Sequence, residues 1–366
     1  MKIFRIELYG RWCLPCQQGI LCSELTDRTN RAYRFSLYDY SGALIRTREV
    51  LAGQGPTEIQ IGTLETVWLS PTGKIFCLDG DYLKSIDPEN LKIETIVKLS
   101  NVVHGYGSRF DLGRISGSSL EEKDGQLVTT FESSGFPDDF TYYLVHCSET
   151  FQNLSVIASA KKEKPLSWKK MEESRQKGGP LETFVDYYGR LRLLRSFAVD
   201  WKRDMAYLIP DIEKPEIERI DLKTKRKTRF PIDIDVKEFT IEREEFDSFY
   251  EYALGETSEL LKQRIKHTLF IPPHAPALMA AMVVEDRLLL ITGNRNWKSG
   301  ENEALVYRLP EMQYQGSFFV PYSNVQNMKW AAPYYISDDC VQKGDDYLFR
   351  FTIYQIKPRD GSHRDR

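Results

Sequence analysis

A strand, a turn and a second strand follow one another in Thr66-Val67-Trp68-Leu69-Ser70-Pro71-Thr72-Gly73-Lys74-Ile75-Phe76-Cys77-Leu78. β-Branched and aromatic residues flank Ser70–Gly73, and proline and glycine supply the backbone angles that a tight turn requires. The pattern continues through Tyr82–Ile86, the turn Asp87–Asn90, and Ile93–Val97. Short strands interrupted about every 8–12 residues by turn residues predict antiparallel meanders.

The same pattern recurs on both sides of this stretch. Upstream, Tyr33–Tyr38 and Ala43–Ile45 flank the turn Asp39–Gly42. Further units centre on residues 126–145, 196–220, 280–308 and 334–354. About six units at the ~40–50-residue spacing of propeller blades predict an all-β fold, a six-bladed β-propeller, with seven blades as the less favoured count. We expect residues 1–357 to form this single domain and residues 358–366 to form a polar C-terminal tail.

Two segments interrupt the strand pattern. The first, residues 160–177, is rich in lysine and glutamate around Trp168. The second, at about 241–267, is predicted to be a helical insertion. One apolar stripe at i, i+3, i+4, i+7 and i+8 supports that prediction, namely Phe246, Phe249, Tyr250, Ala253 and Leu254. A helix on the propeller rim is favoured over a lid above the central opening.

Composition excludes several classes of partner. The formal net charge of the 366 residues is −3, which gives no electrostatic basis for binding nucleic acid. No stretch reaches the ~20 apolar residues that a membrane-spanning helix needs. Residues 1–10 alternate in polarity and show no apolar segment of a secretory signal. We therefore expect a monomer whose partner is a small molecule or a protein.

The turn Gly53-Gln54-Gly55-Pro56-Thr57-Glu58 is the most distinctive local motif. Gly53 and Gly55 permit tight backbone geometry, and Pro56 fixes φ while removing a donor. The Glu58 carboxylate is expected to accept hydrogen bonds from neighbouring backbone amides and so close a loop between blades. A phosphate-binding loop is disfavoured because neither a Lys-Ser/Thr pair nor a helix follows the motif.

Three segments together resemble a known family. Tyr38–Gly42, Gly53–Glu58 and Leu69–Phe76 are similar to bacterial six-bladed β-propeller proteins related to NHL repeats, which typically carry a Gly-x-Gly-Pro-Gly-Glu turn. Thr57 departs from that pattern, at a position where the family usually has glycine. The acidic insertion Glu242–Lys266 and the following segment Pro272–Pro276 add to the resemblance. It implies the fold and an exported or cell-envelope location, whereas most members have no assigned function.

The cysteines near the N-terminus allow three interpretations. Trp12-Cys13-Leu14-Pro15-Cys16 matches a thioredoxin-type pattern, but a strand-to-strand loop is favoured because no helix or βαβ unit follows. Cys13 and Cys16 could also form a local disulfide. With Cys22 they would supply three thiols of a zinc site, although no fourth ligand is evident nearby.

Candidate ligand-binding residues fall in or near loops that lead into predicted inner strands, where propellers commonly bind ligands. They are His104, Arg109, His274, Arg295 and Trp330. The histidines lack metal-ligand spacing. Asp79-Gly80-Asp81 and Asp338-Asp339 fit calcium ligands or turn residues, and turns are favoured.

These observations favour a non-catalytic binding or scaffold protein, without a cofactor, that recognises a small molecule or protein partner at the channel mouth. The alternative is a metal-dependent hydrolase or lyase with calcium or zinc in the central channel. Thiol redox chemistry at Cys13 and Cys16 is the weaker alternative. We expect a binding protein more than an enzyme.

Overall fold

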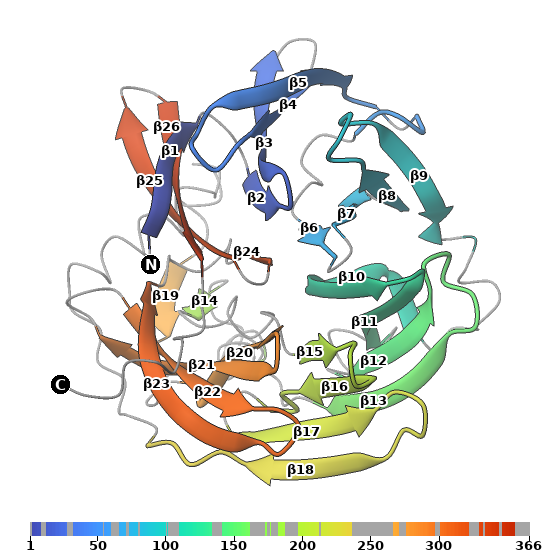
Figure 1. Cartoon of the computed structure of the whole chain (residues 1–366), viewed down its shortest axis with the longest axis vertical. Helices are drawn as coiled ribbons and strands as arrows, with labels where there is room; N and C mark the ends of the chain where they lie inside the picture. The colour runs from blue at the N-terminus through green and yellow to red at the C-terminus, as the bar shows by residue number, and fades with distance from the viewer. Residues whose placement is uncertain are drawn as a thin grey trace.

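The computed structural model is a ring of small sheets around a central axis (Figure 1). It describes residues 2–8, 12–27, 32–53, 55–59, 66–70, 73–79, 81–99, 101, 110–133, 141–161, 173, 176, 182–186, 197–211, 214–235, 266–270, 276–296, 301–321, 329–331, 334–343 and 346–355. All elements named in these ranges are strands. The predicted tail, residues 358–366, lies outside them.

Five antiparallel sheets in the described part each consist of four consecutive strands. The first has β2 (Trp12–Cys16), β3 (Gly19–Asp27), β4 (Ala32–Tyr38) and β5 (Leu44–Leu51). The second has β6 (Thr66–Leu69), β7 (Ile75–Asp79), β8 (Tyr82–Ile86) and β9 (Ile93–Lys98). The third has β10 (Phe110–Lys123), β11 (Gln126–Ser133), β12 (Thr141–Ser148) and β13 (Ser155–Lys161).

The remaining two meanders complete the lower half of the ring in Figure 1. One has β15 (Phe197–Asp200), β16 (Met205–Leu208), β17 (Glu216–Asp221) and β18 (Lys227–Pro231). The other has β20 (Leu278–Val284), β21 (Arg287–Asn296), β22 (Glu301–Arg308) and β23 (Gln313–Pro321). In each meander the first strand is the innermost and the fourth is the outermost (Figure 1).

One further four-stranded sheet joins the two ends of the described chain. It contains β24 (Lys329–Ala331), β25 (Tyr334–Lys343) and β26 (Asp346–Gln355), with β1 (Lys2–Leu8) as its outer strand. β1 runs antiparallel to β26, and Ile6 lies opposite Phe351. The predicted all-β propeller is confirmed, and its five meanders of consecutive strands are close in number to the six blades expected.

Two strands lie apart from the meanders. β14 (Glu182–Asp186) pairs in parallel with β19 (Lys266–Phe270). The helical prediction for 241–267 is wrong for Lys266 and His267, which begin β19, and its remaining residues lie outside the described part. The backbone partner of β19 is a segment more than eighty residues earlier in the chain, so local periodicity could not reveal it. The described residues include no helix that is both long and apolar enough to span a membrane.

The core lies between neighbouring sheets and not within any single sheet. Phe35, Leu37 and Val50 from the first meander pack with Ile75 and Ile86 from the second. Similar apolar clusters join the second meander to the third, the third to the fourth, and the fourth to the fifth. Apolar burial of about 25 cal/mol per Å² therefore acts at every one of these junctions.

The turn Gly53–Glu58 closes the connection between the first and second meanders. As the sequence predicted, the Glu58 carboxylate accepts a hydrogen bond from the backbone N–H of Gly55 at 2.8 Å. A Cβ atom on Gly53 would lie 2.7 Å from Cδ of Glu58, and one on Gly55 would lie 2.9 Å from it. A side chain at either position would have to displace the Glu58 carboxylate and break its hydrogen bond to the Gly55 N–H.

A fully buried lysine fastens this turn to the second meander. The Lys84 ammonium donates to Oδ2 of Asp79 at 2.6 Å, to the Glu58 carbonyl at 2.5 Å and to the Gly55 carbonyl at 3.2 Å. Neither side chain of the Lys84–Asp79 pair is exposed. We call Lys84, Asp79, Gly55 and Glu58 the latch. A buried charge survives only when it is paired and hydrogen-bonded, and the latch meets both conditions.

We expect Lys84→Met to lower the free energy of unfolding by about 3–5 kcal/mol, because Asp79 would remain buried without its cation. Urea unfolding measures the change. Lys92→Met is the matched control, since the Lys92–Glu94 pair is exposed and should contribute no more than about 1 kcal/mol. Equal losses in the two variants would contradict the assignment of the latch.

Candidate functional site

The ring has two flat faces. The innermost strands all start at one of these faces, which we call the start face. Turns that follow inner strands meet at the opposite face. Gln17, in the turn between β2 and β3, lies against Gly73, which is between β6 and β7. The Lys74 ammonium donates to the carboxylate of Glu149, which follows β12, at 2.9 Å. Arg203, between β15 and β16, is coupled electrostatically to Asp286, between β20 and β21. The connections that lead into β6 and β20 therefore lie at the start face.

The structure locates the backbone of two of the five predicted ligand-binding residues. Arg295 lies in β21, opposite Asn302 of β22, and Trp330 lies in β24, the innermost strand of its sheet. His104, Arg109 and His274 lie outside the described residues. All five remain predictions as ligand-binding residues.

A buried polar network occupies the start-face end of β21 and β22. The amide Nδ2 of Asn302 donates to the Thr292 carbonyl at 2.8 Å, and the Thr292 hydroxyl donates to the Glu303 carbonyl at 3.2 Å. Nδ2 of Asn294 donates to Oε2 of Glu303 at 3.2 Å and to the Asp235 carbonyl at 3.0 Å. The network consists of uncharged amides and a hydroxyl beside one carboxylate.

Gly293 explains why the strand can accommodate this network. Its N–H donates to the Pro276 carbonyl at 2.9 Å, and a Cβ atom there would lie 2.9 Å from Pro276 N and Cδ. The connection into β20 thus lies directly against β21. The pairing of β21 with β22 shifts register between Ile291 and Arg295, which places Thr292 and Asn294 in an irregular segment.

Asn302 leaves one acceptor of the network without a partner. Its side chain is 2% exposed, and its Oδ1 makes no hydrogen bond in the described part of the structure. Nδ2 is held by the Thr292 carbonyl and lies 3.6 Å from the Met279 sulfur, so the amide orientation is set. Such an oxygen can accept a hydrogen bond from a hydroxyl, an ammonium or a water. Sequence reasoning did not single out Asn302, because its spacing matches no motif.

The described residues contain no group of three or more histidine, cysteine, aspartate or glutamate residues that could hold a metal ion. Asp79 is held by Lys84, as described above, so it is not free to bind calcium. The preferred prediction that Asp338 and Asp339 are turn residues is wrong. Both lie within β25, opposite Phe351 and Arg350.

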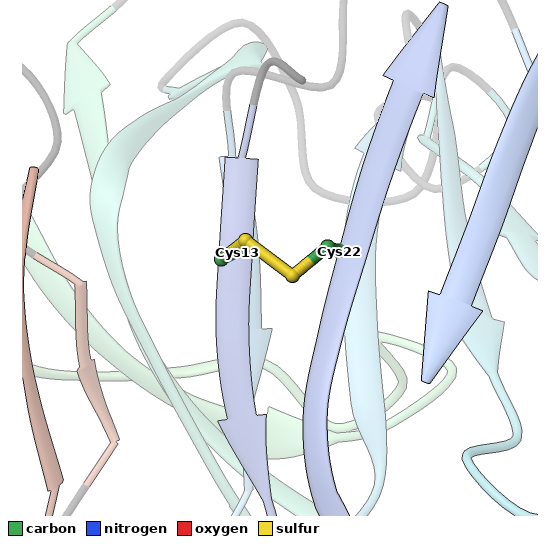
Figure 2. The surroundings of a disulfide bond; sticks show 2 residues. All are labelled: Cys13 and Cys22. Carbon is green, nitrogen blue, oxygen red and sulfur yellow. A yellow bond between two sulfur atoms is a disulfide. The ribbon is translucent and has the colours of Figure 1, made fainter. Parts of the chain in front are cut away.

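The cysteines differ from the sequence-based interpretation in two ways. Trp12–Cys16 forms the innermost strand β2, so the predicted loop is wrong. Cys13 is joined by a disulfide to Cys22 of β3, and not to Cys16 (Figure 2). The two half-cystines lie directly opposite each other in the antiparallel pair, which brings their Cβ atoms within bonding reach.

This pairing leaves Cys16 as a buried thiol in the apolar cluster between the first two meanders. Burial raises the pKa of Cys16, against smaller opposing effects of the Gln18 and Gly19 amides. Burial also raises the pKa of Cys77 and of Cys147 to about 12. A dithiol at Cys13 and Cys16, and a zinc site with Cys22, are both incompatible with this arrangement.

His146 of β12 is a partly buried titratable group with a ring nitrogen, Nε2, that has no hydrogen-bond partner in the described part. Burial lowers the pKa of His146, and the carboxylate of Asp204 opposes that shift. Asp204 itself pairs with Lys223 at 2.6 Å. The folded protein therefore favours the neutral imidazole.

The comparisons with known proteins give only distant structural likenesses. No family model matches this chain, and no curated protein matches it. A solved luciferin-regenerating enzyme is 11% identical, with a TM-score of 0.36 over 95% of this chain and 95% of the other. Regucalcin of Agrobacterium tumefaciens, described as a calcium-binding protein, is 10% identical with a TM-score of 0.33, over 94% and 91%. A prolyl endopeptidase is 11% identical with a TM-score of 0.39, over 95% of this chain and 40% of its own.

Peptide mapping under non-reducing conditions should recover Cys13 linked to Cys22, with Cys16, Cys77 and Cys147 as thiols. We expect the double variant Cys13→Ser, Cys22→Ser to lose about 2–3 kcal/mol of unfolding free energy, from the short loop that the bridge closes. Urea unfolding with and without reductant measures this. Reductant should weaken the parent protein and leave the double variant unchanged. Recovery of a Cys13–Cys16 link would contradict the pairing.

The free energy of unfolding should fall as pH drops below the ordinary histidine pKa of 6.5. In that window the unfolded chain binds a proton at His146 that the folded chain does not, so acid favours unfolding. Between pH 7.5 and 5.5, His146→Gln should lose less stability than the parent protein. Urea unfolding at both pH values is the measurement, and identical losses would contradict the burial effect.

Proposed function

We propose that this propeller is a non-catalytic binding protein that takes a small polar molecule at the start face, beside Asn302. The observation that carries the proposal is the buried Oδ1 of Asn302, which has no partner although its amide is held in place. An unpaired buried acceptor costs about 1–3 kcal/mol, and a donor from a ligand would recover that energy. Asn302 thus supplies an oriented acceptor before any ligand arrives.

The predicted ligand-binding residues support the same location. Arg295 is the cross-strand neighbour of Asn302, and Trp330 belongs to an innermost strand. The segment that contains His274 leads into β20, where Met279 contacts Asn302. His104 and Arg109 precede β10 in the same way. In this proposal the cation, the indole and the imidazoles complete a polar and aromatic binding surface around the amide.

Two further features belong to the proposal. The turn Gly53–Glu58 supports the resemblance to NHL-related propellers, since its glycines and carboxylate interlock. The Cys13–Cys22 disulfide supports the exported or envelope location that the resemblance implies. Disulfides persist in oxidising compartments outside the cytoplasm.

The test is a thermal-shift screen of the whole protein against monosaccharides and free amino acids, followed by calorimetry of any hit. Asn302→Leu should weaken binding of a hit about 5–10-fold, because one buried hydrogen bond is lost. Gln315→Leu is the control, since Gln315 is exposed on the outer strand β23. The unliganded unfolding midpoint of each variant checks its folding. Equal weakening by both substitutions, or a hit unaffected by Asn302→Leu, would overturn the site.

A further inference from the structure

The outer strand β5 has an unusual surface. Three of the five exposed large apolar side chains in the described part lie on it, with exposed fractions of 56% for Leu44, 49% for Ile45 and 65% for Leu51. β5 is the last strand of its sheet, and no other described strand pairs with its outer edge. Beyond its last residue, Ala52 forms an isolated bridge with Ile59, whose N–H donates to the Leu51 carbonyl at 3.1 Å. An apolar, unpaired edge is a template for an added strand.

The pairing register of β4 with β5 shows which charged residues of β5 lie on each face of the sheet. Arg46 and Arg48 lie opposite the buried Leu37 and Phe35, on the face that packs toward the second meander. Arg48 donates to the Leu91 carbonyl of that meander at 3.3 Å. On the other face, Glu49 is paired with Arg34 at 3.4 Å, and Leu51 follows it.

This pattern argues against a second copy of the chain on the edge. Two-fold antiparallel pairing of β5 with itself would place residues of one face opposite each other. Pairing centred on Thr47 sets Arg46 against Arg48, and pairing centred on Arg48 sets that arginine against itself. Like charges directly opposite are destabilising.

We propose that β5 is a docking edge for an extended segment of a partner protein in which acidic and apolar residues alternate. The partner backbone continues the sheet along Arg46–Glu49 and ends before the Leu51 carbonyl, which already accepts from the Ile59 N–H. Its carboxylates lie beside Arg46 and Arg48, and its apolar side chains lie beside Leu44 and Leu51. Charge complementarity selects the partner, and backbone hydrogen bonds supply much of the affinity.

The outer strands β18 and β23 lack this combination. β18 places Lys227 and Arg229 against Glu218 at 3.2 Å each and ends at Pro231, so its charges are already neutralised within the sheet. β23 exposes Tyr314 and Phe319 and contains no charged residue that would select a partner. β5 combines exposed apolar residues at both of its ends with two arginines on one face.

Fluorescence anisotropy of the whole protein with labelled, capped octapeptides tests the proposal. A peptide of alternating glutamate and valine should bind, and a peptide of alternating lysine and valine should bind about fivefold or more weakly. N-methylation of alternate amides in the acidic peptide should abolish binding, because it removes the backbone donors. Equal binding of the methylated peptide, or of the lysine peptide, would overturn the proposal.

Charge-reversal variants distinguish peptide binding at β5 from nonspecific electrostatic attraction to the protein. Arg46→Glu should invert the preference toward the lysine peptide, whereas Arg226→Glu, on the exposed hairpin after β17, should leave it unchanged. Light scattering should show a monomer at the concentrations used. A dimer that Leu51→Asp dissolves would show that a second copy occupies the edge and would also overturn the proposal. Asn302→Leu should not alter peptide binding, so this test is independent of the proposed ligand site.

Discussion

Antiparallel pairing of β1 with β26 is the constraint on which the rest of the ring depends. It supplies the fourth strand of the sheet that contains β24, and that sheet lies against β2 of the first meander. Successive meanders bury apolar faces against one another, so separating any two of them would expose two apolar faces at once. Closure also sets the angle at which the innermost strands converge. The start face therefore owes its geometry to a contact between segments about 350 residues apart in the sequence.

A closed ring still leaves the outer strands of the described meanders as sheet edges, which can pair with another chain. The structure limits this risk at individual strands. The pairing of the third strand with the fourth is interrupted by a register shift in four meanders, those that end in β5, β9, β13 and β23. Such bulges twist an edge away from a flat template. In β5 the shift lies at Leu37–Tyr38, near Ile45, and the pairing from Arg46 to Leu51 is regular. The part from Arg46 to Glu49 is the stretch that can receive another strand, because the Leu51 carbonyl accepts from the Ile59 N–H.

Local chemistry predicted much of the fold and little of the site. β6 and β8 begin and end at the residues that the sequence indicated. A run of β-branched and aromatic residues between turn residues defines a strand from the local sequence alone. β2 was missed because cysteine and proline dominate its five residues, and the parallel pair β14–β19 was missed because its partners are distant. The Cys13–Cys22 bond follows from strand register, which spacing alone does not give. Asn302 was missed for a similar reason: only packing shows which amide oxygen lacks a donor.

Two buried polar groups near the start face differ in how their hydrogen bonds are satisfied, and the contrast bears on the proposed ligand site. Lys84 is surrounded by three oxygens, so its desolvation is offset and the first two meanders are held together. Asn302 has its donor group satisfied and its acceptor unsatisfied, an arrangement that costs stability in the absence of a ligand. An apolar residue of similar shape would avoid that cost, so stability alone gives no reason for an amide at this position. Because the amide is already oriented, a ligand would not have to order it, and less of the binding energy would be lost. In the proposed function, the satisfied ion pair of Lys84 fixes the scaffold, and the unsatisfied acceptor of Asn302 receives the ligand.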